Sequence, residues 1–74
     1  MITVQVISRS SGKPATGKRV NVSFDGIFRG MGREQRTDSR GQAHFSHDPG
    51  NGKVYVDGRT VYQGNLKGCI VVHV

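Results

Sequence analysis

The sequence predicts an all-β domain, and three observations support this prediction. Apolar and polar residues alternate with a period of two along most of the chain, as expected for strands with one buried face. Short combinations of Gly, Pro, Asp and Ser separate the alternating runs. The chain has 11 glycines among 74 residues and no helical periodicity, which also disfavours helix. Short strands separated by such turns are typical of a small sandwich or barrel.

Six runs of alternating residues predict strands. They are ITVQVI (2–7), RVNVSF (19–24), QAHFS (42–46), KVYVD (53–57), the weaker TVYQG (60–64) and CIVVHV (69–74). β-branched and aromatic residues dominate these runs, as is usual in strands. The polar segment REQRT (33–37) is expected to form a charged edge strand, because charge at a sheet edge discourages pairing with other chains.

The alternation also predicts the core, because every second side chain of a strand faces the same side of the sheet. The closing run is unusual in carrying apolar residues on both faces except at His73. This run is therefore expected either to be central in a sheet or to pair with another chain. The predicted core residues are Ile2, Val4, Val6, Val20, Val22, Phe24, Phe45, Val54, Val56, Ile70 and Val72.

Turn signals fill the gaps between the strands. SSGKPATG (10–17) joins the first two strands, and DPGNG (48–52) and DG (57–58) break the chain further on. In TDSRG (37–41) an Asp begins the turn and Gly41 ends it, which is common tight-turn chemistry.

The order of these pieces resembles a known layout. SGKPATGKRVNVSF is followed by TDSRGQAHF, then by PGNGKVYVDG and a closing apolar strand. The residues that match are Gly12, Pro14, Gly17, Val20, Val22, Thr37, Asp38, Gly41, Ala43, Phe45, Gly52, Val54, Val56 and Gly58. In this layout the chain resembles the transthyretin-like, carboxypeptidase-regulatory-like group of immunoglobulin-like β-sandwich domains. The resemblance implies an immunoglobulin-like β-sandwich of six to seven short antiparallel strands, with an accessory role as spacer, stalk or adhesion module.

Length and composition indicate one domain spanning residues 1–74. No charged and apolar leader segment is visible at Met1, and no apolar run approaches the roughly 18 residues of a membrane span. The lone cysteine, Cys69, excludes an internal disulfide framework. We therefore expect a cytoplasmic protein with no membrane partner, or one domain of a larger protein.

The net charge of +6, from 11 Lys and Arg against five Asp and Glu, gives a general attraction to polyanions. The basic residues flank two connections, residues 9–19 and residues 29–40, and the sequence leaves open whether these lie together. Solvated surface charge without a specific partner is the competing interpretation.

No catalytic or metal-binding constellation is apparent. His44, His47 and Asp48 lie within five residues, and Cys69 and His73 are four residues apart. Structural zinc sites need four ligands with recognisable paired spacing, so exposed histidines are the favoured interpretation. Asp38 completes the set of acids, bases and nucleophiles, and nothing in the spacing pairs them. We expect no enzyme activity, no cofactor and no metal.

The segment GIFRGMGREQR (26–36) combines arginines, glycines and large apolar residues. The sequence predicts a non-enzymatic interaction or structural module that binds a protein partner or itself. The alternative is a basic nucleic-acid-binding β-domain, in which exposed aromatic residues such as Phe28, Tyr55 or Tyr62 stack on bases. The predicted partner-binding residues are Phe28, Arg29, Met31, Arg33, Arg36 and Arg40.

Overall fold

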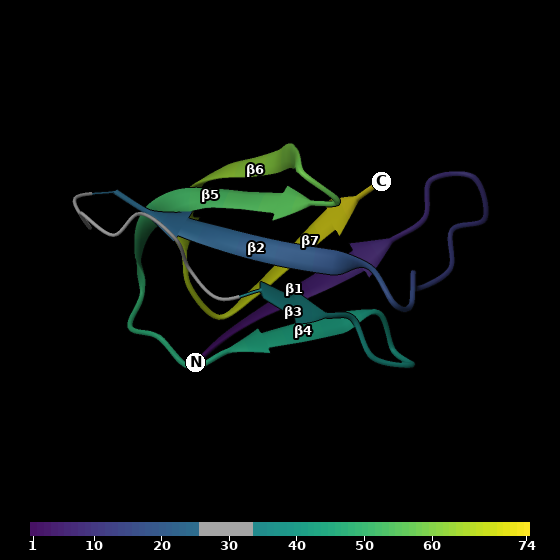
Figure 1. Cartoon of the computed structure of the whole chain (residues 1–74), viewed down its shortest axis with the longest axis horizontal. Helices are drawn as coiled ribbons and strands as arrows, with labels where there is room; N and C mark the ends of the chain where they lie inside the picture. Colours follow the sequence, from purple (N-terminus) through teal and green to yellow (C-terminus); the bar gives the residue numbers. More distant parts are fainter. Residues whose placement is uncertain (26–33) are drawn as a thin grey trace.

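A computed structural model describes residues 1–25 and 34–74 of the chain, which form an all-β fold (Figure 1). The strands are β1 (Ile2–Ile7), β2 (Arg19–Phe24), β3 (Glu34–Arg36), β4 (Gln42–Phe45), β5 (Gly50–Val56), β6 (Arg59–Leu66) and β7 (Cys69–His73). The all-β prediction is confirmed. REQRT does contribute an edge strand, because β3 is exposed throughout and pairs only with β2 among the described strands.

The strands form two sheets with the orders β4-β1-β7 and β3-β2-β5-β6. Every pairing is antiparallel except that of β1 with β7, which is parallel. The prediction of uniformly antiparallel strands is therefore wrong. Hairpin neighbours such as β5 and β6 must run in opposite directions, but β7 lies beside a strand far away in sequence. Its direction is set instead by the path of the chain from one sheet to the other.

One hydrophobic cluster contains buried residues of both sheets, so the two sheets share a single core. All of the predicted core residues are buried. Leu66 and Ala15 are also buried, although the sequence did not single them out. Leu66 is missed because it ends a strand whose alternation is weak.

The strand β6 extends on both sides of the weak run TVYQG. The register between β5 and β6 shifts between Val54 and Tyr55, so the strict alternation is interrupted there. As a result, the neighbouring residues Val61 and Tyr62 are both partly buried and both pack against the core. A bulge of this kind interrupts the alternation of buried and exposed residues, so a period-two pattern does not reveal the whole strand.

The predicted TDSRG turn is present. The carboxylate of Asp38 accepts hydrogen bonds from the main-chain N–H groups of Arg40, at 2.8 Å, and Gln42, at 3.0 Å. Gly41 has a φ of 73°, and a Cβ at this position would lie 2.7 Å from the carbonyl oxygen of Val6. Only glycine fits this turn against β1.

The strand directions bring several connections to one end of the molecule (Figure 1). β1 and β7 both end there, with Ile7 beside His73. β2 begins there, with Arg19 beside Arg36 at the end of β3. The connections at this end are therefore residues 8–18, the β3–β4 turn (37–41) and the β5–β6 turn (57–58). At the other end Asp25 follows β2, and the chain returns at Glu34, which pairs with Asn21 midway along β2.

None of residues 1–25 and 34–74 belongs to a helix of the length and hydrophobicity needed to cross a membrane.

Candidate interaction site

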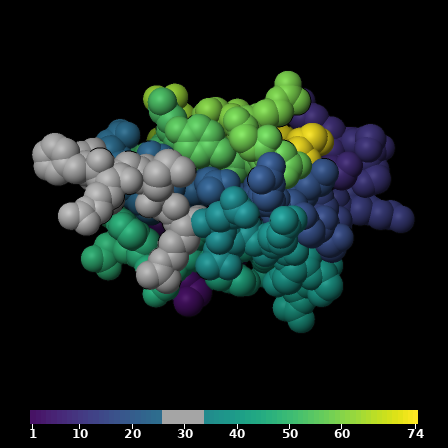
Figure 2. All heavy atoms as spheres, viewed as in Figure 1, coloured from purple at the N-terminus to yellow at the C-terminus, as the bar shows by residue number. Residues whose placement is uncertain are grey.

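Positive charge is concentrated at the end where these connections meet. We call this region the basic end and define it as residues 8–19, 36–41, 57–60 and 73–74. Seven of the nine lysines and arginines in the described ranges lie here, against two acidic residues, Asp38 and Asp57. Loop 8–18 and turn 37–41 lie on the same side of the space-filling view (Figure 2). The seven basic residues are Arg9, Lys13, Lys18, Arg19, Arg36, Arg40 and Arg59.

The question left open by the sequence, whether the two basic connections lie together, is therefore answered for the described residues. Arg36 and Arg40 lie at the basic end with the cations of loop 8–18. Of the six predicted partner-binding residues, these two are in the described ranges, and both are exposed. The other four, Phe28, Arg29, Met31 and Arg33, lie outside the described residues.

A buried threonine fastens loop 8–18 to the β3–β4 turn. The hydroxyl of Thr37 donates to the carbonyl oxygen of Ala15 at 2.6 Å and accepts from the N–H of Lys18 at 2.9 Å. Main-chain hydrogen bonds join the same segments, from Gly17 N–H to Thr37 O at 3.0 Å and from Thr37 N–H to Lys18 O at 2.9 Å. The guanidinium of Arg36 also donates to the carbonyl oxygen of Gly17 at 3.2 Å. Hydrogen bonds thus join the two segments that carry these cations, loop 8–18 and the β3–β4 turn.

Asp57 is an acidic residue that forms ion pairs with two of these cations, Lys18 and Arg19. It begins the two-residue β5–β6 turn, where Asp57 has a φ of 50° and Gly58 a φ of 83°. Both central residues have positive φ, as in a type I′ hairpin, for which Asp-Gly is a preferred sequence. The Asp57 carboxylate lies 3.7 Å from Lys18 Nζ and 3.9 Å from Arg19 Nε. All three side chains are roughly half exposed, so these ion pairs contribute little to stability.

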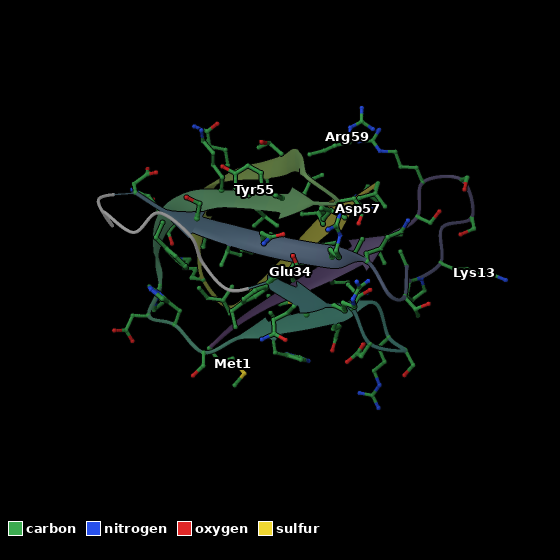
Figure 3. All side chains as sticks on the ribbon, viewed as in Figure 1. Met1, Lys13, Glu34, Tyr55, Asp57 and Arg59 are labelled. Carbon is green, nitrogen blue, oxygen red and sulfur yellow. The ribbon has the colours of Figure 1, made fainter. Side chains whose placement is uncertain are left out.

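A hollow of about 610 Å³ opens at the basic end between the start of β6 and the end of β7. β6 and β7 are joined by Lys67 and Gly68 at the far end, and their lining residues here come from opposite sheets. Figure 3 shows Asp57 and Arg59 at this part of the molecule, with Lys13 further out on the same side. The lining residues are Ser8, Arg9, Lys18, Val56, Asp57, Arg59, Thr60, Val61, His73 and Val74.

The sequence did not single out Arg59 or Asp57 as site residues. The available signal was the dipeptide Asp57-Gly58, because a type I′ turn fixes a hairpin and places the next residue, Arg59, at its start. What the sequence did not reveal is that this hairpin lies beside the ends of β1 and β7.

Two tyrosines considered for base stacking are partly buried. Tyr55 pairs with Asn21, which in turn pairs with Glu34 of β3, and Tyr55 lies on the outer face of its sheet (Figure 3). Tyr62 packs against the core, and its hydroxyl donates to the carbonyl oxygen of Asn65 at 3.3 Å. Tyr55 is thus the described tyrosine that faces outward, with Arg19 as a diagonal neighbour on β2.

The structure brings together two titratable residues that the sequence did not pair. His44 Nε2 lies 3.8 Å from the Asp38 carboxylate, and His44 Nδ1 lies 3.0 Å from the hydroxyl of Thr3. The contact between His44 and Thr3 joins β4 to β1 across an exposed face of the sheet. Cys69 flanks Thr3 from the opposite side, on β7. Two strand spacings separate Cys69 from His44, roughly 10 Å, too far for the histidine to activate the thiol.

The residues considered as metal ligands are dispersed. Cys69 and His73 lie on the same face of β7, but four strand residues place them about 13 Å apart. His47 stacks on Phe24 with ring centroids 3.9 Å apart, and its Nδ1 lies 2.7 Å from the carbonyl oxygen of Asp48. In residues 1–25 and 34–74 no three His, Cys, Asp or Glu side chains are grouped closely enough to hold a metal ion.

The pKa of Asp38 is lowered from its ordinary value. The largest causes are the hydrogen bonds from the main-chain N–H groups of Gln42 and Arg40, which favour the ionised carboxylate. The nearby charges of His44 and Arg40 act in the same direction. Asp38 therefore serves the turn as an ionised hydrogen-bond acceptor, and it stays negative among the cations of the basic end.

Comparison of the chain with protein-family models, curated proteins and solved structures gives no match.

Proposed function

We propose that the chain is a non-enzymatic interaction module that binds an acidic segment of a partner protein at its basic end. The observation that carries this proposal is the concentration of seven basic residues at one end of the molecule, where three of them, Arg9, Lys18 and Arg59, line an open hollow. Clustered charge of one sign attracts and orients a partner of the opposite sign, and loops fixed on a rigid framework are usual binding elements. The separation of Cys69 from His44 supports a role without catalysis.

We further propose that the two sheets pack as an immunoglobulin-like β-sandwich of the transthyretin-like, carboxypeptidase-regulatory-like group. Two points support this proposal: one core is shared by both sheets, and the turns TDSRG and DG form where the layout expects them. The strand order differs from that of immunoglobulin constant domains, in which the first two strands are neighbours. Here β1 pairs with β4 and β7. The proposal is therefore for the sandwich architecture and the transthyretin-like layout, not for the constant-domain order.

The binding proposal is tested by titrating fluorescent poly-glutamate with the protein at low and moderate salt. The triple variant Lys13→Gln, Arg36→Gln, Arg40→Gln should weaken binding about tenfold or more, because each contact between opposite charges is worth up to about 1 kcal/mol. The double variant Lys53→Gln, Lys67→Gln, which removes two positive charges against three, is the control, since these two residues lie away from the basic end. Equal losses in the triple variant and the control would contradict the proposal.

A gain of affinity is expected from Asp57→Asn. This change removes the carboxylate beside Lys18 and Arg19, while asparagine suits a positive φ at the same turn position. Poly-glutamate binding should tighten about two- to fivefold. Asp25→Asn changes the net charge equally at the opposite end and should leave the affinity nearly unchanged.

A role for the segment 26–33 is tested in the same titration with Arg29→Gln, Arg33→Gln. A loss of affinity in this variant comparable to that of the triple variant would extend the binding surface from the basic end to the predicted residues Arg29 and Arg33. An unchanged affinity would confine the surface to the basic end.

Nucleic-acid binding is the second candidate, and the outward-facing Tyr55, with Arg19 as its diagonal neighbour on β2, is the observation that favours it. Aromatic stacking contributes about 1–3 kcal/mol per base in proteins that bind single strands. This candidate predicts steeply salt-dependent binding of single-stranded RNA and a loss of about fivefold or more with Tyr55→Ser. No binding of single-stranded RNA or duplex DNA at low salt would exclude it.

Turnover of any substrate that disappears with Cys69→Ala or His44→Ala would contradict a role without catalysis.

A further inference from the structure

The edge strand β7 has one main-chain edge that no described strand covers. β7 is the outer strand of the sheet β4-β1-β7 and pairs there with β1. The sequence left two options for its apolar residues, a central position or pairing with another chain. The structure excludes the central position among the described strands, and it exposes Val71 by 55%.

The orientation of the main-chain groups of β7 follows from its pairing with β1. The carbonyl oxygen of Gly68 accepts from Thr3 N–H at 2.8 Å, and the N–H of Val74 donates to Ile7 O at 2.9 Å. Main-chain groups of successive residues point to opposite edges of a strand. The even-numbered residues therefore bond to β1, and the N–H and C=O groups of Cys69, Val71 and His73 point away from it.

The side chains on β7 do not protect this edge. Lysine, proline and inward-pointing charges are the usual devices that prevent strand addition. The exposed side chains of β7 are Cys69, Val71 and His73, without a lysine, arginine or carboxylate among them. By contrast, the edge strand β3 carries Glu34 and Arg36 in three exposed residues.

The hollow indicates what kind of chain would use this edge. The end of β7 and the start of β6 both line it, so the space beside His73 is unfilled by the described residues. Arg9 and Arg59 line the same hollow, and no described carboxylate lies within ion-pair distance of either guanidinium. A segment added along β7 would run from Val71 toward two free positive charges.

We propose that β7 accepts an acidic, extended segment of a partner protein as an added strand. This inference rests on the proposed function and specifies its geometry. The segment forms main-chain hydrogen bonds with Val71 and His73, and its acidic side chains reach Arg9 and Arg59 in the hollow. Main-chain bonds supply affinity in strand addition, and alternate side chains supply specificity.

The test uses the whole chain and a short fluorescent peptide of alternating glutamate and valine, with binding followed by anisotropy. The matched probe is the same peptide with N-methyl groups on every main-chain amide, which keeps every charge but blocks pairing on both edges. The unmodified peptide should bind about tenfold or more tightly than the methylated one, because two main-chain hydrogen bonds are lost.

Two sets of variants test the protein side. Val71→Pro removes the outward N–H of β7 at a position where proline is tolerated in an edge strand, and Val71→Thr is its control. Val71→Pro should abolish the preference for the unmodified peptide, and Val71→Thr should keep it. Arg9→Gln, Arg59→Gln should weaken binding of the unmodified peptide about tenfold, with Lys53→Gln, Lys67→Gln as control. If Val71→Pro fails to fold, the comparison of the two peptides on the unaltered chain still decides.

The outcomes are distinguishable. Equal affinity for the two peptides would overturn strand addition and leave charge-based binding at the basic end intact. No binding of either peptide or of poly-glutamate would overturn the proposed function as well. Concentration-dependent dimerisation in sedimentation that Val71→Pro abolishes would show that a second copy of the chain occupies the edge, which would overturn the acidic partner.

Discussion

At the residue scale, Thr37 is the buried polar residue of the described chain that connects the framework of the basic end. Its side chain is in contact with Ala15 O and Lys18 N–H, and no buried side-chain polar atom of the described residues lacks a partner. A hydroxyl in this position satisfies two main-chain groups at once. The position therefore selects a small residue with a hydroxyl group.

We predict that Thr37→Val destabilises the protein by about 1–3 kcal/mol, because it leaves a buried acceptor, Ala15 O, and a partly buried donor, Lys18 N–H, without this partner while keeping the shape. Urea unfolding followed by circular dichroism measures the change. Thr16→Val, the same substitution at an exposed position, should change the stability by less than about 0.5 kcal/mol. A Thr37→Val protein as stable as the original would contradict the connecting role.

Asp38 makes stability depend on pH in the acid range. Its pKa in the folded protein lies below the ordinary value of 3.8, chiefly because of hydrogen bonds from Gln42 and Arg40. A lowered pKa means that the folded state favours the ionised form. The contribution is therefore present above pH 3.8 and is lost as the pH falls through the lower folded pKa.

The expected result is that the melting temperature of the original chain exceeds that of Asp38→Asn at neutral pH, and that this difference shrinks below pH about 4. Asp48→Asn, in a loop where the carboxylate accepts no hydrogen bond among the described residues, is the control. A difference for Asp38→Asn that grows on acidification would have the wrong sign and refute this explanation.

At the element scale, β7 combines a buried face with an exposed face and an uncovered edge. Ile70 and Val72 are buried in the core shared by both sheets, whereas Val71 between them is exposed. The same residue type at successive positions thus serves two purposes. Val72 stabilises the fold, and Val71 lies at the edge where we propose strand addition.

The matched pair Val72→Ala and Val71→Ala separates these purposes. Val72→Ala should lower the free energy of unfolding by about 2–4 kcal/mol, from lost burial and a residual cavity. Val71→Ala should change it by less than about 0.5 kcal/mol. Chemical denaturation of both variants measures the difference, and similar losses in the two would show that β7 is covered on both faces in solution.

At the scale of the whole molecule, the distribution of charge matters more than the net charge of +6. Like charges gathered at the basic end repel one another in the absence of a partner. Raising the salt from about 10 mM to about 150 mM shortens the screening length from about 30 Å to about 8 Å. Screening should therefore relieve the repulsion and stabilise the fold.

We expect the melting temperature to rise over this range of sodium chloride, and to rise less in the double variant Arg9→Gln, Arg59→Gln. Lys53→Gln, Lys67→Gln removes the same net charge from outside the basic end and should leave more of the rise intact. Differential scanning calorimetry measures all three proteins. A melting temperature that falls with salt would show that the ion pairs of Asp57 outweigh the repulsion.

The sequence by itself determined the all-β class, the eleven predicted core residues and the TDSRG turn. These features depend on neighbours in the chain: alternation follows from the geometry of a strand, and turn chemistry acts over four or five residues. The local signal failed at β6, where the bulge beside Val54 breaks the alternation, and Leu66 was missed for that reason.

Only the tertiary structure decided the strand order, the parallel pairing of β1 with β7 and the composition of the basic end. Arg9 lies in the loop 8–18, Arg36 ends β3 and Arg59 begins β6, and no spacing in the sequence relates the three. They lie at one end because the pairing of distant strands sets the direction in which each strand runs. The direction and order of the strands depend on contacts between residues far apart in the chain, and a local sequence pattern does not specify such contacts.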